Sequence, residues 1–174
     1  AEADKLGYPS NFTIYDTQDS VRLITAIIKE MNLDKDVYKP KQIYSRISSY
    51  KNNLITVKAY FNNPELIEAD AMSKKPRLGE VYKNYVDRCF KAGAMDFDDL
   101  LLKTNELLNR FPDVLQKYQN RFRYILVDEY QDTNHSQYLI VRALSDRFQN
   151  ICVVGDDAQS IYAFRGANIN NILN

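Results

Sequence analysis

Two short apolar runs that each end in acids constrain the fold of this chain more than any other feature. The runs are "YILVDE", residues 124–129, and "NICVVGDD", residues 150–157. Each is too short to form a helix of its own and is typical of a buried parallel strand. Between them, residues 133–148 have a helical pattern, and Asn134 with Gln137 offers a capping box for the first turn. The sequence therefore predicts an α/β fold containing a right-handed β-α-β unit with parallel strands.

The region before this unit is mostly helical, from about residue 17 to residue 93. Asp16 or Thr17 can cap the first helix, and Pro40 suits the first turn of the second. Residues 78–91 form a later helix that stops at a glycine. Apolar residues recur every three or four positions, which places them on one helix face; they are Val21, Ile24, Ile28 and Met31, then Ile43, Ile47, Tyr50 and Leu54.

Composition excludes several classes of protein. The 23 basic and 23 acidic side chains balance, so net charge gives no sign of a nucleic-acid partner. No apolar run approaches the roughly 20 residues of a membrane span, and no signal peptide is visible, so we expect no membrane partner. Two cysteines without a CxxC motif predict free thiols and a cytoplasmic location. His135 is the only histidine, which excludes a histidine-based metal cluster.

The acids after the first run could perform nucleotide chemistry. The carboxyl ends of parallel strands meet at one sheet edge, where open α/β sheets bind their ligands. There Asp128 could hold Mg²⁺ beside nucleotide phosphates, and Glu129 could orient or deprotonate an attacking water. Taken alone, "VDE" is explained better by an acidic turn that only caps the next helix. However, Asn134 and Gln137 already supply capping groups.

The second stretch, "VVGDDAQSIYAFRGA" at residues 153–167, combines a tight turn with aromatic and basic groups. Gly155 permits the turn, and Gln159 is an uncharged amide that could touch a γ-phosphate or the water attacking it. Two stacking planes and a cation follow, a set that suits unstacked bases and a phosphate backbone; they are Tyr162, Phe164 and Arg165. An alternative explains this set equally well, with both aromatic residues in the core of a short strand and the arginine solvated.

The two motifs together, "VDEYQDTN" and "VVGDDAQSIYAFRGA", resemble the Walker B motif and motif III of superfamily 1 DNA helicases of the UvrD/Rep/PcrA type. "MDFDDLL" resembles a segment that precedes Walker B in that family, and "EADKLGYPSNFTIYD" is similar to the segment that leads into domain 1B. The resemblance implies a fragment with two parts. Residues 1–93 would be a helical 1B-like domain with its lead-in segment, and residues 94–174 would be part of the RecA-like, P-loop-NTPase-type motor domain 1A.

The resemblance also implies an activity, because the family comprises ATP-driven 3′-to-5′ translocases on single-stranded DNA that unwind duplexes. It implies ATP and Mg²⁺ as cofactors, DNA in both forms as partner, and repair or replication proteins as further partners. By position, Asp128 would bind the metal and nucleotide, Glu129 would activate water, and Gln159 would sense the γ-phosphate. Single-stranded DNA would contact Tyr162, Phe164 and Arg165. Ala163 stands where some members carry a larger or basic residue, which changes the contacts expected there. Phe164 stands where others have tryptophan, a change that should preserve stacking.

The chain contains no G-x-x-x-x-G-K-[ST] loop, since none of its five glycines precedes a lysine. Without that loop no backbone cradle or lysine receives the β-phosphate. We therefore expect the fragment alone to be inactive. Two other functions remain open. One is a non-catalytic DNA- or protein-binding module, and the other is a receiver-type domain that uses Asp128 with Mg²⁺.

Two charged clusters have weaker interpretations. No acid occurs among residues 39–58, which could face duplex phosphates or simply form a solvated helix face; their basic residues are Lys39, Lys41, Arg46, Lys51 and Lys58. Asp98 and Asp99 begin another helical pattern. Because a helix macrodipole favours acids in the first turn, we interpret them as structural rather than functional.

Overall fold

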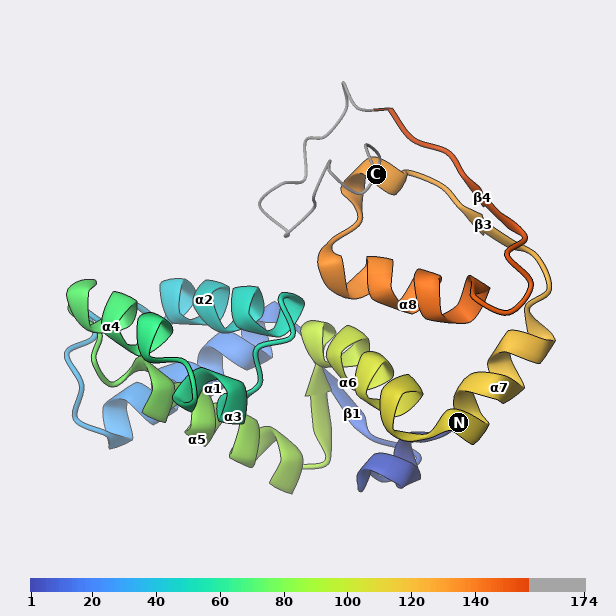
Figure 1. Ribbon diagram of the computed structural model, residues 1–174. Helices are drawn as coiled ribbons and strands as arrows, with labels where there is room; N and C mark the ends of the chain where they lie inside the picture. The colour runs from blue at the N-terminus through green and yellow to red at the C-terminus, as the bar shows by residue number, and fades with distance from the viewer. Residues whose placement is uncertain (157–174) are drawn as a thin grey trace. The chain divides into compact units, whose positions relative to one another are not determined.

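The computed structural model describes residues 1–156, which contain helices and short parallel strands of the predicted α/β class (Figure 1). One compact unit comprises Ala1–Leu100, and a second begins at Leu101. No helix in residues 1–156 is long and apolar enough to cross a membrane.

The first unit consists mainly of five helices that surround one core. Its elements in chain order are η1 (Ala3–Leu6), β1 (Thr13–Tyr15), α1 (Thr17–Glu30), α2 (Pro40–Asn52), α3 (Val57–Phe61), α4 (Pro64–Met72), α5 (Leu78–Lys91) and β2 (Ala94–Asp96). The predicted helix ends are confirmed. Asp16 caps α1 in a capping box with Asp19, and Pro40 occupies the first turn of α2. Gly93 follows α5 with a positive φ of 61°, a conformation that glycine adopts without strain.

The core of this unit combines isoleucines with tyrosines. Helix α1 packs against both α2 and α5. Most residues of the stripes predicted for α1 and α2 lie in the shared core, namely Ile24, Ile28, Ile43, Ile47 and Tyr50. The largest buried side chains include Tyr60, Tyr82 and Tyr85. Gly79 at the start of α5 lets the Tyr60 ring approach, because a Cβ there would lie 2.3 Å from the ring. A tight and largely aromatic core therefore fixes how the helices pack.

Strands β1 and β2 pair in parallel, with Thr13 opposite Ala94 and Tyr15 opposite Asp96 (Figure 1). The helices α1 to α5 thus form an insertion between two neighbouring parallel strands. The sequence did not predict these strands, since each has only three residues. They bring Asp16 and Asp96 to the same edge of the small sheet.

Helix α6 (Phe97–Arg110) starts in the first unit and continues into the second. The second unit then contains α7 (Pro112–Arg121), β3 (Ile125–Val127), η2 (Tyr130–Asp132), α8 (His135–Ser145) and β4 (Ile151–Val153). Strands β3 and β4 are parallel, and α8 connects them, so the predicted β-α-β unit is confirmed (Figure 1). The predicted capping box of Asn134 and Gln137 starts α8.

The predicted burial of these two strands is wrong. Leu126 is 72% exposed, Ile151 41% and Val153 47%. Within residues 1–156 each of the two strands pairs only with the other. A two-stranded ribbon cannot bury both faces by itself. The apolar runs therefore encode strands correctly, but Leu126, Ile151 and Val153 lie at the surface, while Ile125 and Val127 are half-buried.

Candidate active site at the β3–β4 edge

The two acidic loops lie side by side, as the parallel strands predict. Val127 pairs with Val153, and Asp128 and Glu129 follow β3 directly. Backbone hydrogen bonds extend the pairing beyond the strands, because Val154 N–H donates to the Val127 carbonyl at 2.8 Å and Tyr130 N–H donates to the Val154 carbonyl at 2.9 Å. This ladder fixes the loop after β3 against the loop after β4.

Asp128 and Glu129 are both exposed, and local hydrogen bonds hold them. Asp128 Oδ1 accepts the Glu129 backbone N–H at 2.8 Å. Glu129 adopts a left-handed conformation with φ 50° and ψ 43°, which is uncommon for a residue other than glycine. The turn points two adjacent carboxylates into solvent, where a ligand can reach them.

An exposed carboxylate at this place fits Mg²⁺ together with a nucleotide. Magnesium is usually bound through one or two carboxylates, several waters and the phosphates of the substrate. No group of three or more potential metal ligands occurs among residues 1–156. Asp128 would therefore hold the ion together with phosphate and water rather than within a cluster of acids from the described residues. When bound, Mg²⁺ would neutralise developing charge on the phosphates.

Gln131 is a part of the site that the sequence analysis missed. Its side chain is 1% exposed. Its Nε2 donates to Glu129 Oε2, and its Oε1 accepts the Asp156 backbone N–H at 3.0 Å. A single amide thus joins the acid after β3 to the loop after β4. The sequence feature that could have indicated this role is an uncharged amide side chain two residues after the acid pair.

Several predicted site residues lie outside the described part of the chain. They are Gln159, Tyr162, Phe164 and Arg165, together with the second acid of the β4 loop, Asp157. Of the predicted residues, the structure therefore places Asp128 and Glu129, with Asp156 on the neighbouring loop.

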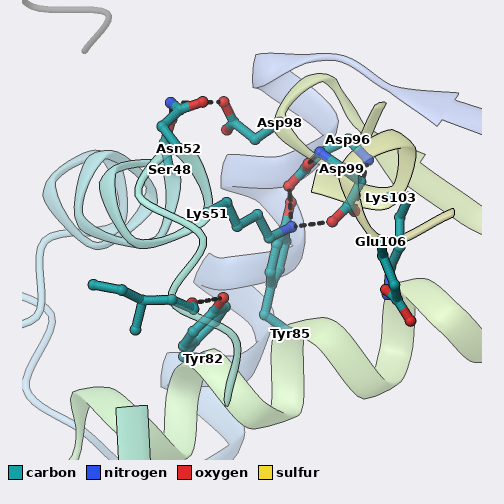
Figure 2. Close-up of polar contacts among 11 residues, drawn as sticks. Ser48, Lys51, Asn52, Tyr82, Tyr85, Asp96, Asp98, Asp99, Lys103 and Glu106 are labelled. Carbon is teal, nitrogen blue, oxygen red and sulfur yellow. Dashed lines mark hydrogen bonds and ion pairs between the residues drawn. The ribbon is translucent and has the colours of Figure 1, made fainter. Parts of the chain in front are cut away.

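The basic stretch at residues 39–58 is not a continuous phosphate-binding face. Lys51 is buried, and its Nζ lies 2.7 Å from Asp96 Oδ2 and 2.9 Å from Asp99 Oδ1 (Figure 2). Tyr85 donates its hydroxyl hydrogen to Asp96 Oδ2 at 2.7 Å. Lys51 was assigned to a solvated or DNA-facing surface, and that assignment is wrong. It faces inward because two carboxylates at the β2–α6 junction receive its charge.

Charge pairing dominates the electrostatics of this cluster. Burial by itself lowers the pKa of Lys51, but Asp96 and Asp99 outweigh burial and raise that pKa above its usual value. Burial opposes ionisation of Asp96, yet Lys51 and the Tyr85 hydroxyl hold its pKa below the usual range. For Asp99 burial is the larger effect and raises the pKa. Lys51 is therefore a permanent cation and is unavailable to an external phosphate.

The acids at the start of α6 have the structural role that the sequence predicted, with an addition. Asp99 N–H donates to Asp96 Oδ1 at 2.7 Å, and Asp96 N–H donates to Asp99 Oδ2 at 3.1 Å, a reciprocal helix cap. Asp98 accepts a hydrogen bond from Asn52 at 3.2 Å (Figure 2), and burial raises its pKa. The buried ion pair with Lys51 is what the sequence did not reveal.

Arg46 is also engaged within the protein. Its Nη2 lies 3.1 Å from Asp70 Oδ1, and Asp70 accepts two further hydrogen bonds, from Tyr50 and Tyr60. The Arg46 side chain remains 45% exposed, while Asp70 is buried. The exposed basic residues of this stretch are Lys39, Lys41 and Lys58, with the partly covered Arg46.

Comparisons with known proteins identify the family to which this chain belongs. The family model described as the UvrD/REP helicase N-terminal domain matches residues 1–174. The ATP-dependent DNA helicase PcrA of Bacillus subtilis is 44% identical over 178 residues, which cover 99% of this chain and 22% of that protein. The PcrA helicases of Staphylococcus epidermidis and Staphylococcus aureus are 43% and 42% identical over 173 residues, covering 99% of this chain and 23% of each relative. The chain thus spans less than a quarter of the length of these relatives, and it belongs to the UvrD/REP helicase family.

Proposed function

We propose that this chain is part of an ATP-dependent 3′-to-5′ DNA helicase and carries its Walker B acids. Asp128 would bind Mg²⁺ beside the nucleotide, and Glu129 would activate the attacking water. The observation that carries the proposal is the pair of exposed acids on a loop that is hydrogen-bonded to the loop after a parallel neighbour strand. Membership of the helicase family and the names of the relatives support it.

The division into domains is part of the same proposal. We assign residues 1–93 to a helical 1B-like domain with its lead-in segment, and residues 94–174 to part of a P-loop-NTPase-type motor domain 1A. The pairing of β1 with β2 supports a refinement, in which the strand of the lead-in segment belongs with the motor domain and α1 to α5 are inserted into it. In the motor domain, Gln159 would sense the γ-phosphate, and single-stranded DNA would contact Tyr162, Phe164 and Arg165.

The 174-residue chain alone should not hydrolyse ATP. Its sequence has no P-loop motif to cradle the β-phosphate. The test is phosphate release from Mg²⁺-ATP by the purified chain, with and without single-stranded DNA, beside a Glu129→Gln variant. Turnover that requires Mg²⁺ and disappears in the variant would refute inactivity of the chain while supporting the role of Glu129. In the full-length helicase, the same variant should abolish turnover and retain ATP binding.

A non-catalytic role in duplex binding is the second candidate, because three lysines stay exposed. They are Lys39 just before α2, Lys41 in α2 and Lys58 in α3. If this face binds phosphates, replacing Lys39 and Lys41 by glutamate should weaken duplex binding and reduce its salt dependence. Lys91→Glu, at the exposed end of α5, is the matched control. Equal affinity of both charge-reversed proteins would exclude a specific role for the α2 face.

A further inference from the structure

We propose that Gln131 is a positioning residue that couples the carboxylate of Glu129 to the loop after β4. This inference rests on the proposed function, in which Glu129 activates the attacking water. It adds a residue that touches neither substrate nor metal. The loop after β4 continues in the sequence toward Gln159, the residue proposed to sense the γ-phosphate.

The chemistry of the amide makes the link specific. Glu129 Oε2 requires a donor, and the Asp156 backbone N–H requires an acceptor. A glutamine side chain offers one of each at its two ends. A carboxylate offers only acceptors, and an apolar side chain offers neither. Among side chains of this length, glutamine alone satisfies both contacts at neutral pH.

The surroundings hold Gln131 rigidly. It lies in the turn η2, where Asp132 N–H donates to the Glu129 carbonyl at 2.9 Å. Thr133 Oγ1 donates to the Tyr130 carbonyl at 2.7 Å, and the Tyr130 side chain is itself buried. Gln131 is 1% exposed. The Glu129 carboxylate and the loop after β4 are therefore both held against the same fixed amide.

The role is one of orientation rather than stability. Glu129 and Asp156 are both exposed, so water can replace either hydrogen bond when Gln131 is removed. A catalytic base that is free to rotate loses the alignment with its water. Misplacement by about 1 Å can cost on the order of 100-fold in rate. We therefore expect loss of turnover without loss of nucleotide affinity or folding.

The test uses the full-length helicase and compares kcat and KM for ATP at saturating single-stranded DNA. Gln131→Met, which removes both hydrogen bonds at similar volume, should lower kcat by about 10- to 100-fold and leave KM within about threefold. Gln131→Glu keeps the acceptor for Asp156 but repels Glu129, so it should be equally impaired. Gln131→Met combined with Glu129→Gln should be no slower than Glu129→Gln alone, because both changes act through one carboxylate.

The outcomes separate this inference from the proposed function. If Glu129→Gln retains turnover, the proposed function fails. If Glu129→Gln is inactive but both Gln131 variants turn over normally, only the coupling role is wrong. A raised KM with normal kcat, or an additive loss in the double variant, would also overturn it. If Gln131→Met lowers the melting temperature as well, the Gln131→Glu protein decides, since normal turnover by it excludes the role.

Discussion

Replacement of Lys51 by methionine should lower the free energy of unfolding of the first unit by about 3–5 kcal/mol at neutral pH. The ammonium group lies 2.7 Å from Asp96 and 2.9 Å from Asp99, and the Lys51 side chain is 1% exposed. Methionine retains much of the buried volume but leaves both carboxylates without a cation. The variant therefore measures the cost of uncompensated charge rather than the cost of a cavity.

The size of the loss follows from protonation. The least costly response of the folded variant is to take up a proton on one of the two carboxyl groups. An unfolded aspartate has a pKa of about 3.9, and each pH unit is worth about 1.4 kcal/mol, so holding that proton at pH 7 costs about 4 kcal/mol. The folded variant then binds a proton that the unfolded chain has released, so its stability falls as the pH rises above about 4.

In wild type two shifts oppose each other, because burial raises the pKa of Asp99, whereas Lys51 and the Tyr85 hydroxyl outweigh burial and depress the pKa of Asp96. The contribution of Asp96 to stability is present above the unfolded pKa and is lost only as the pH falls through the folded value. The difference in stability between the two proteins should therefore shrink as the pH falls from about 7 to about 4, by at most about 1.4 kcal/mol per pH unit.

Urea denaturation at several pH values, followed by near-UV circular dichroism, measures this effect. The chain has no tryptophan, and the buried tyrosines of the first unit dominate its ordered aromatic residues. Lys58→Met, on an exposed side chain, should change stability by less than about 0.5 kcal/mol. Adding Asp99→Asn to the Lys51 variant should remove the pH dependence. A loss below about 1 kcal/mol, or one independent of pH, would refute the charge argument.

Three further predictions concern packing and reactivity. Gly79→Ala should lower the free energy of unfolding by about 1–3 kcal/mol, because the new Cβ would lie 2.3 Å from the Tyr60 ring; an unchanged urea midpoint would contradict this contact. Asp70→Asn should cost about 2–3 kcal/mol in the same assay, since a buried acceptor of three hydrogen-bonding groups loses its charge. A disulfide reagent should label exposed Cys152 quickly and Cys89 only on unfolding, because burial raises the pKa of the Cys89 thiol to about 12; equally fast labelling of both would oppose this.

Features encoded by neighbouring residues could be predicted from the sequence. The cap at Asp16, the helix start at Pro40 and the capping box of Asn134 with Gln137 all depend on contacts within a few positions. The β3–β4 pair was predictable for a related reason, because two apolar runs around one amphipathic helix leave few topologies. In each case the information lies within a short segment.

Features that depend on distant partners could not be predicted. Strand β1 has three residues and pairs with a strand beyond five helices, so neither shows a readable alternation. Lys51 lies in a stretch without acids, and its burial depends on carboxylates of another element. Leu126 is exposed because no further strand pairs with the β3–β4 ribbon within residues 1–156. The residues around Leu126 carry no information about such a partner.

The two acidic motifs show why local sequence cannot separate structural from functional acids. "AMDFDD" and "ILVDE" each place acidic residues at the carboxyl end of a three-residue parallel strand, just before a helical segment. Asp96 and Asp99 are buried and share the ammonium group of Lys51. Within residues 1–156, Asp128 and Glu129 have only hydrogen bonds from Glu129 N–H and Gln131, and their charge is left uncompensated in solvent. An acid pair that already shares a buried cation gains little from another one, whereas an open pair gains much. The distinction therefore lies in the partner, which for the β2 motif comes from α2.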